Sequence, residues 1–161
     1  MRRATLALGL LAAGPAIARD SLGVFETWAA FRDPARGGAA QRCYAIAEPQ
    51  IANAPGAYAT VSFWPAARVR GQFYIHFPRP LSPRTAPALA LNGQRFALVV
   101  RGTAAWARDA RMDAAIVAAL RNASAMSVSA IDAQGRTLSA GWPLQGAATA
   151  IDAAGLGCAR G

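Results

Sequence analysis

Alternation of hydrophobic and polar positions dominates the chain after its first eighteen residues and predicts several short β-strands. It is clearest over Tyr58 to Trp64 and Gln72 to Phe77, where aliphatic or phenylalanine side chains alternate with more polar ones, as in a sheet with one dry face. An aromatic-rich run over Val24 to Phe31 and a run over Gln41 to Ala47 predict two further strands. Four prolines between Pro78 and Pro87 remove backbone donors, which predicts a loop or a sheet edge there.

A hairpin and a helix are predicted in the middle of the chain. Asn92-Gly93 separates the apolar runs Leu89 to Leu91 and Gln94 to Val100, and this dipeptide suits a two-residue turn with positive φ. Phe96, Leu98 and Val100 are expected to share one face of the second strand. From Asp109 to Asn122 the apolar spacing becomes helical, and Asp109 is a suitable N-cap.

The remaining pattern predicts two strands and a short terminal helix. The strands cover Met126 to Val128 and Thr137 to Trp142, with a turn at Asp132 to Gly135, and the helix covers Leu144 to Ala154 and ends at Gly155. Two helices are too few for parallel crossover connections. The sequence therefore predicts a mainly β fold, an antiparallel β-sandwich or barrel-like domain with one mid-chain helix and one short C-terminal helix.

The first eighteen residues have the features of an export signal. Arg2 and Arg3 precede a short apolar run, and Ala16-Ile17-Ala18 provides a small-x-small cleavage pattern. We expect residues 1–18 to be a cleaved signal peptide and residues 19–161 to form a single β-rich domain. No later apolar run has the roughly 20 residues that a membrane-spanning helix needs, so no span is expected in the mature chain.

Two cysteines lie far apart in the sequence, Cys43 near the start of the mature chain and Cys158 near its end. An exported chain meets an oxidising compartment, which favours a disulfide between them. The alternative is a reactive thiol pair. It is less favoured because neither residue belongs to a C-x-x-C motif.

The chain is strongly basic. It has seventeen arginines, no lysine and eight acidic residues, and loss of Arg2 and Arg3 with the signal leaves fifteen arginines and a net charge of +7. Codon bias toward arginine is the favoured explanation of this charge, because the scattered arginines form no basic run of the kind that binds nucleic acid. The functional alternative is affinity for an anionic polymer or an envelope protein. The oligomeric state stays open.

A set of ordered motifs supports a family resemblance. The motifs are an early Trp28, Cys43-Tyr44, Val61-Ser62-Phe63-Trp64-Pro65, a helix ending near Arg121, Met126-Ser127-Val128, Trp142, and Leu144 to Ala150 leading into Cys158. In this order they resemble the invasion-associated locus B family of exported alphaproteobacterial proteins. The resemblance implies a β-rich periplasmic or surface-associated domain and, in some members, a contribution to host-cell invasion, but it does not imply a reaction. Many members carry a further Cys after the early Trp, where this chain has Phe31 and Arg32, so it resembles a distant member.

Candidate catalytic groups are few. His76 is the sole histidine, and the chain has no Gly-x-Ser-x-Gly elbow. Asp109 and Asp113 share a helical face, where capping is favoured over acid–base chemistry. One histidine and two disulfide-bonded cysteines leave no ligand set for zinc. We therefore expect no enzyme, metal or cofactor, and the alternative is a small periplasmic hydrolase or enzyme modulator that uses His76.

Binding is the function that remains after these exclusions, and the alternative for the residues below is ordinary strand-end aromatics beside a solvated loop. Aromatic side chains beside guanidinium groups can engage sugars, phosphates or acidic protein groups. We therefore expect a non-enzymatic protein of the periplasm, with the outer membrane or cell surface as alternative locations. The candidate binding residues are Trp64, Arg68, Arg70, Tyr74, His76 and Arg79.

Overall fold

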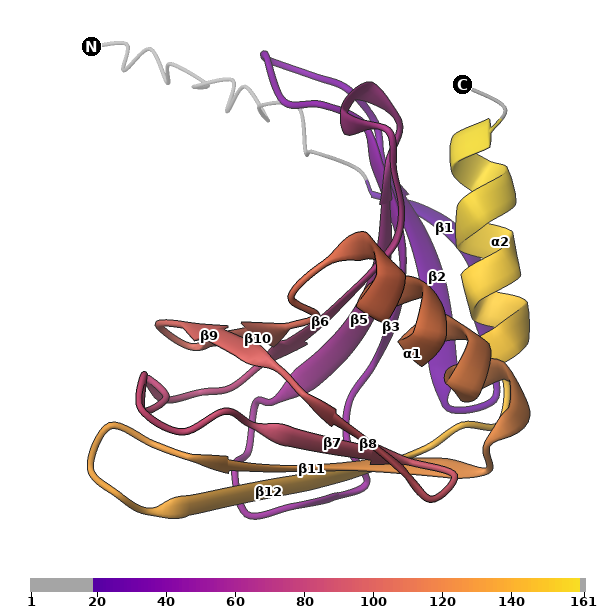
Figure 1. Cartoon of the computed structure of the whole chain (residues 1–161). Helices are drawn as coiled ribbons and strands as arrows, with labels where there is room; N and C mark the ends of the chain where they lie inside the picture. Colours follow the sequence, from indigo (N-terminus) through magenta and orange to yellow (C-terminus); the bar gives the residue numbers. More distant parts are fainter. Residues whose placement is uncertain (1–18, 160–161) are drawn as a thin grey trace, which may run out of the picture.

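The computed structural model describes residues 19–159, so the predicted signal peptide lies outside the described residues. The described chain forms two antiparallel sheets and two helices, one mid-chain and one C-terminal (Figure 1), which confirms the predicted mainly β fold. Each sheet keeps two edge strands and the two pack as an open sandwich, so the barrel-like alternative is wrong.

The larger sheet contains seven strands. Their bounds are β1 (Asp20–Phe25), β2 (Trp28–Asp33), β3 (Arg42–Ala47), β5 (Tyr58–Trp64), β6 (Val69–His76), β9 (Val99–Arg101) and β10 (Ala104–Trp106). The spatial order is β1-β2-β3-β5-β6-β10-β9. A single 3-10 turn, η1 (Pro65–Ala67), connects β5 to β6.

The smaller sheet contains five strands and lies across the lower part of the molecule in Figure 1. Its strands are β4 (Ile51–Ala52), β7 (Ala88–Leu91), β8 (Gln94–Ala97), β11 (Ala125–Ile131) and β12 (Thr137–Pro143), in the order β4-β12-β11-β7-β8. The helices are α1 (Ala110–Asn122) and α2 (Ala147–Ala159). No helix of the described residues is long and apolar enough to cross a membrane.

Two buried tryptophans connect the sheets. Trp28 of β2 and Trp142 of β12 are each 1% exposed and lie in the core between the sheets. The Trp28 Nε1–H donates to the Pro143 carbonyl oxygen at 3.0 Å, and the Trp142 Nε1–H donates to the Ala47 carbonyl oxygen at 3.1 Å. Each indole therefore buries apolar area and satisfies a carbonyl group at the end of a strand in the other sheet.

Helix α2 covers the part of the large sheet that the small sheet leaves free, alongside β1, β2 and β3. Its buried face is made of small or aliphatic residues, including Ala150, Ile151 and Ala154. The disulfide between Cys43 of β3 and Cys158 in the last turn of α2 confirms the predicted pairing. The bond therefore joins the last turn of α2 to an inner strand of the large sheet.

The end predicted for this helix was wrong, because α2 continues through Gly155 to Ala159. A Cβ at Gly155 would lie 3.3 Å from the Phe63 ring, and one at Gly157 would lie 2.5 Å from Leu22 Cδ1. Both glycines let the helix approach the sheet closely. Tertiary packing therefore outweighs the helix-ending tendency of glycine.

Two strand predictions also needed correction. The run Val24 to Phe31 is divided by a tight turn at Glu26-Thr27 into β1 and β2, with Glu26 at φ 54°. The Asn92-Gly93 turn is present, but β8 ends at Ala97 and the chain crosses to the large sheet as β9. Phe96 and Val100 therefore belong to different sheets.

Helix α1 begins where the sequence predicts. The Asp109 carboxylate accepts the Met112 amide at 2.8 Å as an N-cap. Asp113 reaches β6 and accepts the Phe73 amide at 2.8 Å. At the other end of α1, Arg121 donates to Asp152 of α2 at 2.6 Å. Both carboxylates of the first turn therefore have structural partners.

Candidate binding site

The outer face of the large sheet is the face turned away from the core. Along β5, alternation places Val61 in the core and Tyr58, Thr60, Ser62 and Trp64 on the outer face. Thr60 and Ser62 are only 7% and 5% exposed although they face outward. Larger neighbouring side chains surround these two hydroxyl groups, so they form the floor of a depression.

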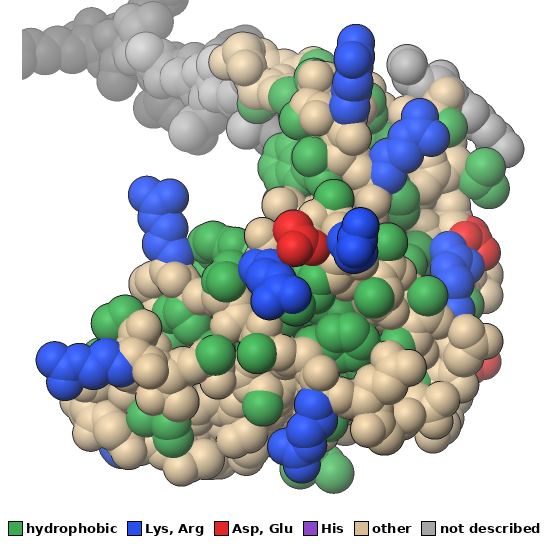
Figure 2. All heavy atoms as spheres, viewed as in Figure 1, with side chains coloured by type: hydrophobic (Ala, Val, Ile, Leu, Met, Phe, Trp, Pro, Cys, Tyr) green, Lys and Arg blue, Asp and Glu red, His purple; other side chains and the backbone are tan. Residues whose placement is uncertain are grey.

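This depression is a hollow of about 400 Å³ on β3, β5, β6 and β10. Strand register explains how its walls meet, since Thr60 pairs with Tyr74 and Tyr74 pairs with Trp106. Figure 1 shows β9 and β10 extending to the left of the strands that run upward, and Figure 2 shows the corresponding step in the molecular surface. The walls of this hollow, called the aromatic hollow below, are Tyr58, Trp64, Gln72, Tyr74, Trp106 and Arg42.

An arginine cluster lies at one end of the aromatic hollow. The Arg42 Nη2–H donates to Asp33 at 2.7 Å, and its guanidinium lies 4.2 Å from the Tyr44 ring centroid and 5.3 Å from that of Trp64. Arg19 donates to the other oxygen of Asp33 at 2.9 Å. Partial burial opposes ionisation of Asp33, but the hydrogen bonds from Arg42 and Arg19 outweigh it and lower its pKa. One carboxylate thus faces two guanidiniums, which leaves positive charge in excess.

A second hollow of about 520 Å³ adjoins the first and shares Arg42 and Trp64 with it. We call it the basic hollow because Arg19 and the exposed Arg36 also line it, against the single carboxylate of Asp33. The two hollows therefore lie next to each other on the sheet, one lined mainly by aromatic side chains and the other by arginines. Trp64 and Arg42 stand where they meet.

The predicted residues Tyr74 and His76 do lie on this face. The His76 ring stacks on Tyr58 with centroids 4.9 Å apart, and Thr103 Oγ1 lies 3.5 Å from His76 Nδ1. Burial lowers the pKa of His76, and burial together with neighbouring Tyr58 raises the pKa of Tyr74. Within the described part of the chain, the Tyr58 ring and the Thr103 hydroxyl flank His76. The His76 side chain does not line the aromatic hollow.

Arg68 and Arg70 lie on the opposite side of the sheet from Trp64. A bulge at Gly71, with φ +80°, shifts the pairing so that Ser62 faces Gln72 while Phe63 faces Arg70. Arg70 therefore points to the side of α2, where it and Arg68 line a hollow beside Cys158. The expectation that these arginines share a surface with Tyr74 is wrong, because one extra residue reverses the alternation.

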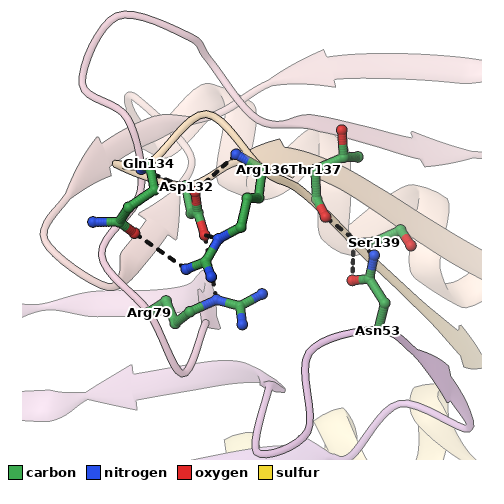
Figure 3. Close-up of polar contacts among 7 residues, drawn as sticks. All are labelled: Asn53, Arg79, Asp132, Gln134, Arg136, Thr137 and Ser139. Carbon is green, nitrogen blue, oxygen red and sulfur yellow. Dashed lines mark hydrogen bonds and ion pairs between the residues drawn. The ribbon is translucent and has the colours of Figure 1, made fainter.

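Arg79 is also separate from the aromatic hollow. It forms an ion pair with the buried Asp132 at 3.3 Å, beside the turn between β11 and β12 (Figure 3). Burial disfavours the charged form of Asp132, but hydrogen bonds from Arg136 and from the Gln134 amide outweigh it and lower its pKa. Figure 3 also shows the Asn53 side chain bonded to β12 through Thr137 and Ser139. This corner of the small sheet is a structural network.

Several residues of the site were not identified from the sequence. Trp106 was missed because β10 has three residues and no strand signal. Tyr58, Thr60 and Arg42 belong to strands that were predicted, and their alternation with buried residues could have placed them on the outer face. The isolated Gly71 inside a strand pattern was the available sign of the bulge.

Charges elsewhere on the surface are dispersed. On the face shown in Figure 2, basic side chains stand apart from one another and do not form a continuous patch. Among the described residues, no group of three or more His, Cys, Asp or Glu side chains could hold a metal ion.

The comparisons with known proteins give no family for this chain. No family model matches it, and no match was found to a curated protein or to a solved structure.

Proposed function

We propose that the chain is an exported, non-enzymatic envelope protein that binds an anionic component of the bacterial envelope on the outer face of its large sheet. In this proposal it acts in the periplasm and is a distant member of the invasion-associated locus B family. The observation that carries the proposal is the position of Arg42, stacked between Tyr44 and Trp64 where the two hollows meet.

The arginine cluster is suited to an anionic ligand. A guanidinium stacked on rings and bonded to a carboxylate loses little further side-chain freedom when it binds. Arg42 and Arg19 share Asp33, so neither is fully neutralised. The remaining positive charge favours an anionic group in the adjoining basic hollow.

Export is supported by the disulfide and by the first eighteen residues. A disulfide between Cys43 and Cys158 persists in an oxidising compartment. The arginine pair, apolar run and small-x-small pattern supply the signal for reaching such a compartment.

The test compares removal of one charge on each face of the sheet. The protein from residue 19 is titrated with polygalacturonate, polyphosphate and poly-aspartate at low salt. Binding is followed by the change in total tryptophan fluorescence, to which Trp64 and Trp106 in the aromatic hollow should contribute most. We expect Arg42→Gln to weaken binding of at least one probe by about tenfold or more, the loss of one charge-assisted hydrogen bond. Arg70→Gln removes the same charge from the opposite face and should change affinity less than about twofold.

Circular dichroism verifies that both variants remain folded. Asp33 keeps Arg19 as a partner in Arg42→Gln, so the fold should tolerate this change. Equal weakening by the two variants, or no binding of any probe, would contradict the proposal.

A further inference from the structure

We infer that the ligand is an acidic polysaccharide that lies along both hollows, with sugar rings against the aromatic side chains and an acidic group at Arg42. This inference rests on the proposed function and names its ligand class.

The aromatic hollow combines the two kinds of contact that a sugar ring requires. Tyr58, Trp64, Tyr74 and Trp106 provide flat apolar surfaces, on which the C–H face of a pyranose ring can pack. The floor adds hydroxyl groups that both donate and accept hydrogen bonds, and Gln72 adds an exposed amide at the wall. Sugar hydroxyls likewise both donate and accept.

The size of the depression favours a chain over a single sugar. The two hollows measure about 400 and 520 Å³ and meet at Trp64 and Arg42. Each alone falls within the range of about 300–1,000 Å³ that holds one small molecule. A ligand that fills both is therefore an oligomer, with Trp64 in contact with its middle units.

The distribution of charge favours an acidic polysaccharide over other anionic polymers. Among residues 19–159, Arg42 is the one charged residue that lines the aromatic hollow, while Arg19 and Arg36 line the basic one. Polyphosphate has no apolar surface to place against four aromatic rings. An acidic peptide can pair its carboxylates with the arginines, but Asp and Glu side chains have no flat apolar ring face to place against the aromatic side chains. A uronic acid chain supplies apolar ring faces, hydroxyls and carboxylates together.

The test uses galacturonate oligomers of two to six units beside neutral dextran oligomers of equal length, polyphosphate and poly-aspartate. We expect the galacturonate hexamer to bind at least tenfold more tightly than the dimer and than the dextran hexamer. Trp106→Leu should weaken the hexamer about tenfold and leave any polyphosphate binding unchanged, because Trp106 lies away from the arginine cluster. Isothermal titration calorimetry measures these affinities without depending on tryptophan fluorescence.

A second, milder substitution, Gln72→Ala, tests the same hollow in case Trp106→Leu does not fold. Gln72→Ala removes an exposed amide from the hollow wall and should weaken the hexamer several-fold, while Gln50→Ala, an exposed glutamine beside β4, should not. Tighter binding of polyphosphate, poly-aspartate or dextran than of galacturonate would overturn the inference, as would hexamer binding that both Trp106→Leu and Gln72→Ala leave intact. In those cases the proposed function stands if Arg42→Gln still weakens an anionic probe. If it weakens none, both fail.

Discussion

Gly146 shows how a single residue controls the approach of two segments. It precedes α2 with φ +84°, directly beside the turn between β1 and β2. A Cβ at this position would overlap the carbonyl oxygen of Phe25. Gly135, in the turn between β11 and β12, has nearly the same φ of +80° with nothing within 4 Å of its Cβ position. Comparing substitutions at these two glycines therefore distinguishes the cost of backbone strain from the cost of steric overlap.

Alanine at these two positions should have unequal effects. Gly135→Ala incurs only the left-handed backbone strain and should lower the free energy of unfolding by about 1–2 kcal/mol. Gly146→Ala adds the overlap with Phe25 and should lose about 1–3 kcal/mol more. Urea unfolding of both variants measures the difference. Similar losses would mean that the β1–β2 turn moves freely away from α2.

At the scale of elements, α2 depends on the rest of the chain for its position. Its disulfide closes a loop with a sequence separation of 115 residues. Apart from Ile151, its contacts with the sheet are made by small side chains and glycines, such as Ala150 and Gly155, which bury little apolar area each. The covalent bond therefore contributes much of what holds α2 on the large sheet.

Removal of the bond should destabilise the protein strongly. In the chain-entropy model a loop of this length contributes up to about 4.7 kcal/mol. We expect the double variant Cys43→Ala/Cys158→Ala to lose about 2–5 kcal/mol in urea unfolding and to show faster amide exchange in α2 than in β11. The oxidised native protein is the reference. Uniform exchange across both elements would show that α2 is held by packing alone.

Prediction from sequence was most accurate for elements with a long, regular pattern. The strand Tyr58–Trp64 and the helix capped by Asp109 were predicted within one residue of their ends. Elements decided by contacts with distant residues were mispredicted. The turn at Glu26-Thr27 lacks the usual turn residues, and the bulge at Gly71 is packed against Val117 of α1, a contact that local periodicity does not contain.

At the scale of the whole molecule, the two sheets share one hydrophobic core. The chain passes back and forth between the two sheets. For example, β8 of the small sheet ends at Ala97, and β9 of the large sheet begins at Val99. Trp28 and Trp142 add hydrogen bonds between the sheets. If one sheet unfolds, the buried side chains on the inner face of the other sheet become exposed to water. We therefore predict that the two sheets unfold cooperatively.

A substitution in the small sheet should therefore destabilise the large one equally. Trp142→Phe leaves the buried Ala47 carbonyl without its donor and should cost about 1–3 kcal/mol. The fluorescence of the three remaining tryptophans, Trp28, Trp64 and Trp106, all of which lie in the large sheet, and the far-ultraviolet circular dichroism should both shift to the same lower urea midpoint. Two separate transitions would show that the sheets unfold independently.

The sequence by itself determined the mainly β fold class, the two helices and the residues available for the disulfide, because period-two alternation, helical spacing and cysteine position are local properties of the chain. Period-two alternation also placed three of the six candidate binding residues, Trp64, Tyr74 and His76, on the outer face of the large sheet, and their role in binding stays a prediction. Only the tertiary structure decided that Arg68, Arg70 and Arg79 lie elsewhere and that Arg42 and Trp106 line the aromatic hollow. The physical reason is that a bulge, a short strand and an ion pair each depend on a partner distant in sequence.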